Sequence, residues 1–239
     1  MWVLALGIPL VVGSRGAAQD DPPQEIYKKI ERQISEAAAF RVKFTCAPEK
    51  ETPEVPFKAS GTLTVARGNR LRLEIAEDTA PARLALVSDG KGIVTLATED
   101  QKEVRRDTPG TLTADWAAKS ARIGVLGTIF IEPPLQEKAP FPRWAQCCKL
   151  EDFKKGPSEE NLETLTFSAL LFKDPPKENE PVLLAQIAVK VWYNPKTLVI
   201  RKRRVMDSAP GSKVALVEKY DEWSFDPSPG ADDFKLPSK

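Results

Sequence analysis

Residues 60–100 read SGTLTVARGNRLRLEIAEDTAPARLALVSDGKGIVTLATED, and this stretch decides the fold. Apolar residues alternate with polar ones through most of it, which is typical of half-buried β-strands. Asp89-Gly90 lies between LALV and IVTLA and predicts a hairpin turn. Short polar links between such strands indicate an antiparallel meander with one solvent-exposed face. No residue in the stretch stands out as a catalytic group.

The same alternation continues on both sides of this stretch. It precedes it in FRVKFTCA, residues 40–47, and returns in four segments of the last third, residues 161–172, 182–194, 197–207 and 212–226. The chain of 239 residues contains 21 prolines, which favours many turns over long helices. We therefore expect one domain of nine or more antiparallel strands.

Two segments have helical rather than strand periodicity. In residues 23–38, Ile26, Ile30 and Ile34 recur at four-residue spacing behind Pro23, which predicts an amphipathic helix with one apolar stripe. Residues 111–131 are rich in alanine and predict a second helical segment. The Pro-rich segment 132–142 that follows predicts a long loop of the lid or binding type. We expect the helices to lie on the sheet.

Charge and motif content narrow the function. The 35 Lys and Arg nearly balance the 34 Asp and Glu, which argues against nucleic acid as the main partner. The basic run of residues 201–204 invites a nucleic-acid interpretation, but Glu218, Asp221 and Glu222 on the next predicted strand favour a charge-paired sheet face.

Recognisable catalytic motifs are missing from the sequence. It contains no histidine, no Gly-rich phosphate loop, no Gly-X-Ser-X-Gly elbow and no paired metal-ligand spacing. Carboxylates are plentiful, but they sit mainly in links and on polar strand faces, where solvation is the ordinary explanation. We therefore expect no enzyme, no cofactor and no metal.

The first residues have the pattern of an export signal. An apolar run from Trp2 to Val12 precedes the small residues Gly16, Ala17 and Ala18, which predicts a signal peptide over residues 1–18 and a mature domain over 19–239, although the basic start of such signals is missing. The run is too short for a spanning helix.

Export permits disulfides among the three cysteines. One of the adjacent pair Cys147 and Cys148 could bridge to Cys46, and three buried free thiols are the alternative.

The order of these segments resembles the periplasmic outer-membrane lipoprotein carriers, the LolA-like family. FRVKFTC is followed by GTLTVARGNRLRLEI, by LVSDGK and, at the end, by WSFDPSPGADDF, as in that family. The resemblance touches both ends of the mature chain and most strands between. It implies an α+β, mainly β fold: a strongly curved antiparallel sheet, or incomplete barrel, with helices covering an apolar concave face.

The resemblance also implies a function. Family members take up lipoprotein acyl chains in the apolar cavity, so we expect a monomeric periplasmic carrier or chaperone that meets inner-membrane donor and outer-membrane acceptor proteins. Arg67 matches the family arginine that holds the lid closed through helix carbonyls, and the alternative is a surface residue at a strand end. Apolar strand positions supply the expected lining: Phe44, Leu63, Val65, Leu71, Leu73, Ile75, Leu86 and Trp192.

Some features depart from the family pattern or allow another interpretation. Gly68 stands where the family usually has proline, and the segment from Thr111 to Lys149 is long. Trp192 has the opposite strand parity from Val191, so both cannot face one cavity. The apolar positions could equally form a filled core, and the chain would then be a structural or protein-interaction protein of the envelope that binds partners through its edges or the loop at 132–142.

Overall fold

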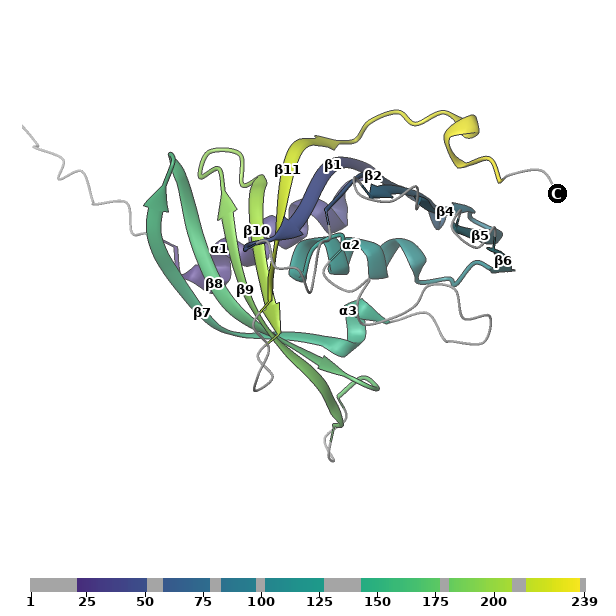
Figure 1. Ribbon diagram of the computed structural model, residues 1–239. Helices are drawn as coiled ribbons and strands as arrows, with labels where there is room; N and C mark the ends of the chain where they lie inside the picture. The colour runs from purple at the N-terminus through teal and green to yellow at the C-terminus, as the bar shows by residue number, and fades with distance from the viewer. Residues whose placement is uncertain are drawn as a thin grey trace, which may run out of the picture.

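The computed structural model describes residues 21–50, 58–77, 83–97, 102–126, 143–176, 181–207 and 214–236. Within these ranges, eleven strands form a single antiparallel sheet in the order β6-β5-β4-β3-β2-β1-β11-β10-β9-β8-β7 (Figure 1). Among the described residues no pairing joins β6 to β7, so the sheet is open. The strands are β1 (Ala39–Pro48), β2 (Ala59–Ala66), β3 (Arg70–Glu77), β4 (Arg83–Asp89), β5 (Gly92–Ala97), β6 (Lys102–Asp107), β7 (Cys148–Glu159), β8 (Leu162–Phe172), β9 (Leu183–Tyr193), β10 (Ile200–Asp207) and β11 (Ala215–Phe225).

Strand β1 joins two meanders into this one sheet. Strands β1 to β6 follow one another in space as in sequence, and so do β7 to β11. Val42 of β1 lies opposite Leu63 of β2 on one side and opposite Trp223 of β11 on the other. The first and last strands of the described sheet are thus neighbours at its centre, and the edge strands β6 and β7 come from the middle of the chain.

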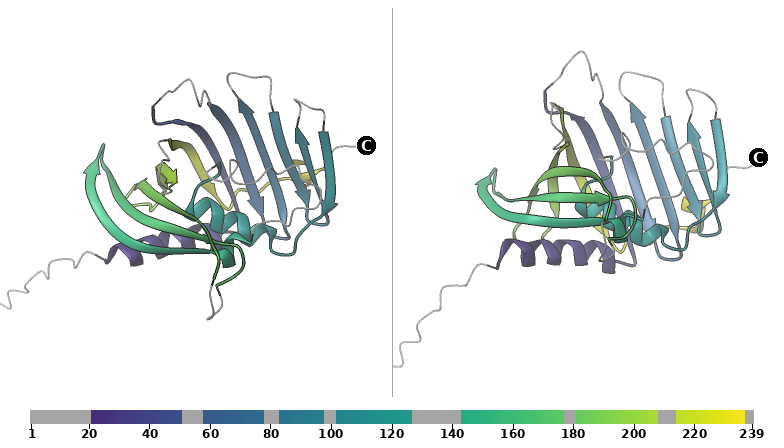
Figure 2. Two further views of the ribbon diagram at one scale, coloured as in Figure 1. Left: turned by 60° about the horizontal axis from the view of Figure 1, so that its bottom comes forward. Right: turned by 90° about the horizontal axis from the view of Figure 1, so that it is seen from below.

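Helices cover one face of the sheet. The helices are α1 (Pro23–Glu36), α2 (Leu112–Arg122) and α3 (Trp144–Cys147), with a 3-10 turn, η1 (Ala231–Phe234), near the C-terminus. Ile26, Ile30 and Ile34 of α1 are buried as expected, and Tyr27 joins them. Figure 2 shows the sheet curving strongly around α1 and α2, which lie on its concave side.

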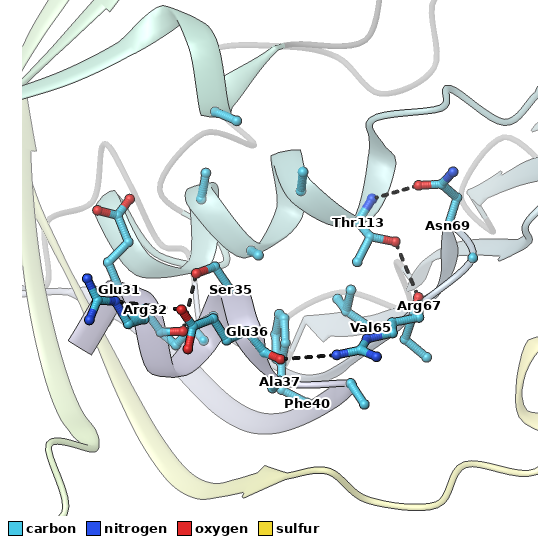
Figure 3. Close-up of a pocket in the computed structure, with 18 of the residues that line it drawn as sticks. Glu31, Arg32, Ser35, Glu36, Ala37, Phe40, Val65, Arg67, Asn69 and Thr113 are labelled. Atoms are coloured by element: carbon cyan, nitrogen blue, oxygen red, sulfur yellow. Dashed lines mark hydrogen bonds and ion pairs between the residues drawn. The ribbon is translucent and has the colours of Figure 1, made fainter. Parts of the chain in front are cut away.

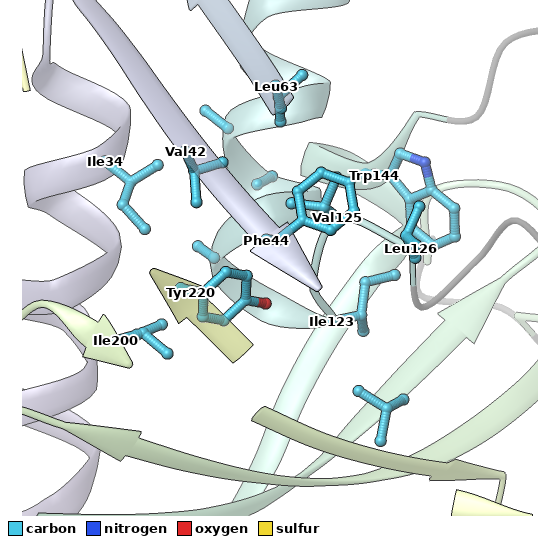
Figure 4. Close-up of a cluster of buried hydrophobic side chains, with 14 of the residues drawn as sticks. Ile34, Val42, Phe44, Leu63, Ile123, Val125, Leu126, Trp144, Ile200 and Tyr220 are labelled. Carbon is cyan, nitrogen blue, oxygen red and sulfur yellow. The ribbon is translucent and has the colours of Figure 1, made fainter. Parts of the chain in front are cut away.

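The hydrophobic core lies between these helices and the concave face. It receives side chains from both meanders, from α1 and α2, and from the segment that follows α2. Ile123, Val125 and Leu126 of that segment are 0% exposed, and they approach Phe44 of β1 and Trp144 of α3 (Figure 4). The segment therefore fills part of the concave side with the chain's own side chains.

The expected fold class is confirmed, with differences in individual elements. The structure is mainly β, with an open antiparallel sheet and helices on its concave face. The second helix ends at Arg122, because Gly124 turns the chain with a φ of 98°. Strands β6 and β7 were not predicted. The expected signal peptide, residues 127–131 of the expected second helical segment, and the loop at 132–142 lie outside the described residues.

Candidate functional site

A pocket of about 670 Å³ opens between α1, α2 and the sheet. Its walls are the second half of α1, the alanine-rich side of α2 and the adjoining ends of β1 and β2 (Figure 3). Three alanines of α2, Ala114, Ala117 and Ala118, line it together with Phe40 and Val65 of the sheet. Small side chains on the helix therefore leave a gap above Phe40 and Val65, while charged side chains of α1 also line the pocket, so its walls are partly polar. The volume lies within the range of ordinary ligand sites.

The N-terminal end of α2 is fixed at one side of this pocket. The Thr113 amide donates to Asn69 Oδ1 at 3.2 Å, and the Thr113 hydroxyl donates to the Ala66 carbonyl at 3.2 Å. Both partners belong to β2 or to the turn after it, where Asn69 has a φ of 57°. The turn that carries Arg67 is therefore held against α2.

Arg67 itself lies at the mouth of the pocket, between the sheet and α1. Its Nη2 donates to the carbonyl of Glu36, the last residue of α1, at 3.5 Å (Figure 3). Helix-terminal carbonyls lack intrahelical partners, so an arginine is a suitable donor there. The distance is long for a hydrogen bond, and the side chain is exposed. Its lid-closing role stays a prediction.

Two further arginines hold α2 at its C-terminal end. Arg203 of β10 is 0% exposed; its Nη1 donates to the Ser120 carbonyl at 2.7 Å and its Nη2 to the Ala121 carbonyl. Arg122 pairs with Glu31 of α1 at 2.6 Å and donates to carbonyls of α3 and of Cys148. Burial lowers the pKa of Arg122, but Glu31 more than compensates, so the pKa lies above its ordinary value.

A buried carboxylate holds the segment after α2. Glu218 of β11 is 1% exposed and accepts hydrogen bonds from the amides of Val125 at 2.9 Å and Leu126 at 2.7 Å. The Tyr220 hydroxyl donates to Glu218 and accepts from Arg203 Nη1 at 3.2 Å, so it links the two charges. A Cβ at Gly124 would lie 2.4 Å from the Glu218 carboxylate. We call Arg203, Glu218 and Tyr220 the buried latch.

The sequence interpretation missed the buried latch. The sequence pattern favours a charge-paired sheet face for Arg203. The residue does lie opposite Glu218 in the β10–β11 register, but both side chains point into the core. Strand parity carries the signal that could have found them. Arg203 is two residues from Val205, and Glu218 is two residues from Tyr220, so each charge occupies a core position of its strand.

The structure brings most of the predicted lining residues together. Seven of them share the core cluster on the concave side: Phe44, Leu63, Val65, Leu71, Leu73, Ile75 and Leu86. Of these, Val65 lines the pocket between the helices. Phe44 and Ile75 line a second pocket of about 540 Å³ along β1 to β4. The other four pack in the core cluster, so they would meet a ligand only after the helices or the segment after α2 moved.

Trp192 lies apart from this group. Val189 and Val191 of β9 belong to the core cluster, and Trp192 faces the other side of the sheet. There its indole donates to Glu159 at 2.7 Å, and the ammonium groups of Lys190 and Lys202 lie 4.5 Å from its ring centre. The structure thus separates Trp192 from the seven other predicted lining residues.

The cysteines are all free thiols. Cys46 and Cys148 are buried and Cys147 is partly exposed. Burial raises the pKa of Cys148 to about 11, and it also raises the pKa values of Cys46 and Cys147. Of the two alternatives, three unpaired thiols is therefore the one observed.

The described ranges contain neither a cluster of metal-ligating side chains nor a helix that could span a membrane. No group of three or more Cys, Asp or Glu side chains gathers there as metal ligands would. Among the described helices, none has the length and apolar character needed to cross a membrane.

No protein-family model and no curated protein matches this sequence. Solved structures that it resembles include LprF from Mycobacterium bovis, at 11% identity and a TM-score of 0.40 over 90% of this chain and 96% of that one. The lipoprotein LppX from Mycobacterium tuberculosis has 8% identity and a TM-score of 0.37 over 89% of this chain and 100% of that one. A LolA superfamily protein from Nitrosomonas europaea has 10% identity and a TM-score of 0.39 over 90% and 98%. Similarities with such low sequence identity and TM-scores concern the fold alone. The function has to be inferred from the geometry of this chain.

Proposed function

We propose that this protein is an exported lipid carrier that shields acyl chains, such as those of lipoproteins, during transfer to the outer membrane. The observation that supports this function most is the pocket of about 670 Å³ between α1, α2 and the concave sheet face. Each methylene removed from water contributes about 0.8 kcal/mol, so an acyl chain in transit requires an apolar enclosure. An open sheet covered by helices can provide one.

In this proposal the helices act as the lid. Ala114, Ala117 and Ala118 face the pocket from α2, and alanine side chains lose little buried apolar area when two elements separate. Arg67 makes one long bond to the end of α1, which a modest gain from ligand burial can offset. Once the helices moved away from the sheet, the seven predicted lining residues of the core cluster would contact the ligand.

A second candidate function is favoured by the segment after α2. Ile123, Val125 and Leu126 are fully buried on the concave side, as expected for a core that the chain fills by itself. The protein would then be a structural or interaction protein of the envelope, and it would work through its surface.

Lipid extraction distinguishes the two functions. The protein is purified without detergent from an exported fraction, incubated with lipoprotein-bearing membranes, extracted with organic solvent and analysed by mass spectrometry. The carrier proposal predicts stoichiometric lipid or co-purified acylated protein. Protein that stays free of lipid after this incubation would favour the filled core.

A pair of variants assigns the binding to the pocket. Ala114→Phe fills the pocket from an exposed position of α2, and Gln24→Phe places the same side chain at an exposed position of α1 outside the pocket. The affinity for a fluorescent fatty-acid probe should fall at least about tenfold for Ala114→Phe, equivalent to about 1.4 kcal/mol. It should stay unchanged for Gln24→Phe. Equal affinities of the two variants would exclude this pocket as the entrance.

A further inference from the structure

The large apolar side chains that the described part of the chain leaves exposed are three consecutive residues. Val182, Leu183 and Leu184 are 60, 48 and 61% exposed. Singly scattered exposed apolar residues are ordinary, whereas these three follow one another at one place and form a local apolar patch. We call these three residues the apolar tip.

The apolar tip lies where the β8–β9 hairpin leaves the body of the sheet. Leu183 pairs with Phe172 of β8, and the Lys173 amide donates to the Val182 carbonyl at 3.0 Å. The described pairing of β9 with β10 begins only at Ile187, so the hairpin extends past that neighbour. Figure 1 shows these ends of β8 and β9 projecting at the bottom of the view, beyond the rest of the sheet.

The backbone at the tip is irregular. The register between β8 and β9 shifts between Leu171–Ala185 and Phe172–Leu183, so β9 contains one extra residue there, Leu184. Such a bulge bends the strand and redirects its side chains. The irregularity therefore coincides with the exposed apolar residues.

We propose that the apolar tip inserts into a lipid surface and positions the protein on the membrane from which it takes its ligand. This inference rests on the proposed carrier function, because a carrier of acyl chains must meet a membrane or its lipids. The tip projects from the body, so its side chains can reach the acyl boundary of a bilayer, and Lys173, which lies opposite Val182, can extend its ammonium group to the head groups.

The size of the tip favours lipid over a protein partner. A specific protein interface buries about 800 Å² on each side and involves about 20 residues or more. Three apolar side chains near the end of a hairpin supply little of the apolar centre that such an interface contains. Shallow insertion into lipid needs no matching surface and remains reversible, as repeated loading and release require.

Flotation with neutral phosphatidylcholine vesicles tests the inference. The double variant Leu183→Ser/Leu184→Ser removes the two leucines at exposed positions, and Gln186→Ser changes an exposed polar residue of the same strand as the control. The wild-type protein and the control should float with the vesicles, and the partition coefficient of the double variant should be at least tenfold lower. Raising the salt concentration should leave wild-type binding unchanged, because the contact is apolar.

Three other results of these experiments would contradict insertion of the apolar tip into lipid. Equal partitioning of the double variant and the wild type, or no flotation of the wild type, overturns the inference. A dimer in sedimentation equilibrium that the double variant abolishes also overturns it, because a second copy then covers the tip. Binding of a soluble fatty-acid probe without vesicles is measured in parallel. Failure of probe binding alone contradicts the carrier function, whereas failure of flotation alone contradicts the tip's role.

Discussion

Arg203 is the residue whose removal should most affect the cover of the sheet. Arg203→Met should lower the free energy of unfolding by about 3 kcal/mol or more. The Ser120 carbonyl would lose its hydrogen-bond donor. The buried Glu218 carboxylate would lose the guanidinium that is linked to it through the Tyr220 hydroxyl. Arg201→Met, at an exposed position of the same strand, should change it by less than about 0.5 kcal/mol. Urea denaturation measures both. Equal effects would mean that the buried latch adds no stability.

The three thiols should differ in reactivity according to burial. Burial raises the pKa values of all three, and to about 11 for Cys148, so little of the reactive thiolate is present at pH 8. Cys147 is the most accessible, so a disulfide reagent should titrate one thiol slowly in the native protein and three in denaturant. Cys147→Ser should abolish the native reaction. Fewer than three thiols in denaturant would reveal a disulfide.

The Asp89-Gly90 turn is an element that the sequence predicts correctly, and it also makes a prediction about pH. The amides of Gly92 and Lys91 donate to Asp89 Oδ1 and hold its pKa below the ordinary value of 3.8. A carboxylate whose pKa is lower in the folded protein than in the unfolded chain stabilises the fold fully at a pH above the unfolded-state pKa. This stabilisation is lost as the pH falls through the folded-state pKa. The wild-type advantage over Asp89→Asn should therefore shrink between pH 5 and pH 2 in thermal unfolding. It should not exceed about 1 kcal/mol, because the carboxylate is largely exposed. A constant or growing difference would contradict this assignment.

Strand alternation reveals the inner strands and misses the edges for a physical reason. Inner strands such as β3 have one wet and one buried face, so Leu71, Leu73 and Ile75 alternate with charged residues. The edge strands have to discourage pairing with other chains. Among the described side chains of β6, residues 103–107, only Val104 is buried, and β7 includes Pro157 and two register shifts. Charged residues, proline and bulges interrupt the alternation of apolar and polar residues from which strands are predicted.

The candidate site could be predicted only in part. Sequence periodicity indicates which face of a strand a side chain occupies, but it does not indicate which residues of other elements the side chain contacts. The seven clustered apolar residues follow from alternation. The sequence-based prediction places Trp192 in the same lining despite its strand parity, whereas the structure places it on the other face. The pocket depends on how α2 lies against α1, which no local pattern contains. The buried latch joins β10 and β11 to a segment more than 80 residues away.

At the scale of the whole molecule, the space available for a ligand depends on whether the segment after α2 can leave the concave face. The pocket of about 670 Å³ is present with that segment in place, and a larger acyl load would require Ile123, Val125 and Leu126 to be displaced. Their release would break the bonds from the Val125 and Leu126 amides to Glu218. Ligand binding and local opening of the core would then be coupled.

Hydrogen exchange detects this coupling. If ligand displaces the segment, exchange of the Val125 and Leu126 amides should become at least about tenfold faster on saturation with a fatty acid, while the amides of β2 and β3 stay protected by their ladder. Ala114→Phe provides the control, because fatty acid at the same concentration should then leave the exchange rates unchanged. Slower exchange at residues 125 and 126 on saturation would mean that the ligand binds beside the segment and stabilises it. In that case the pocket between the helices would be the entire binding site, and the buried latch would be a permanent part of the core.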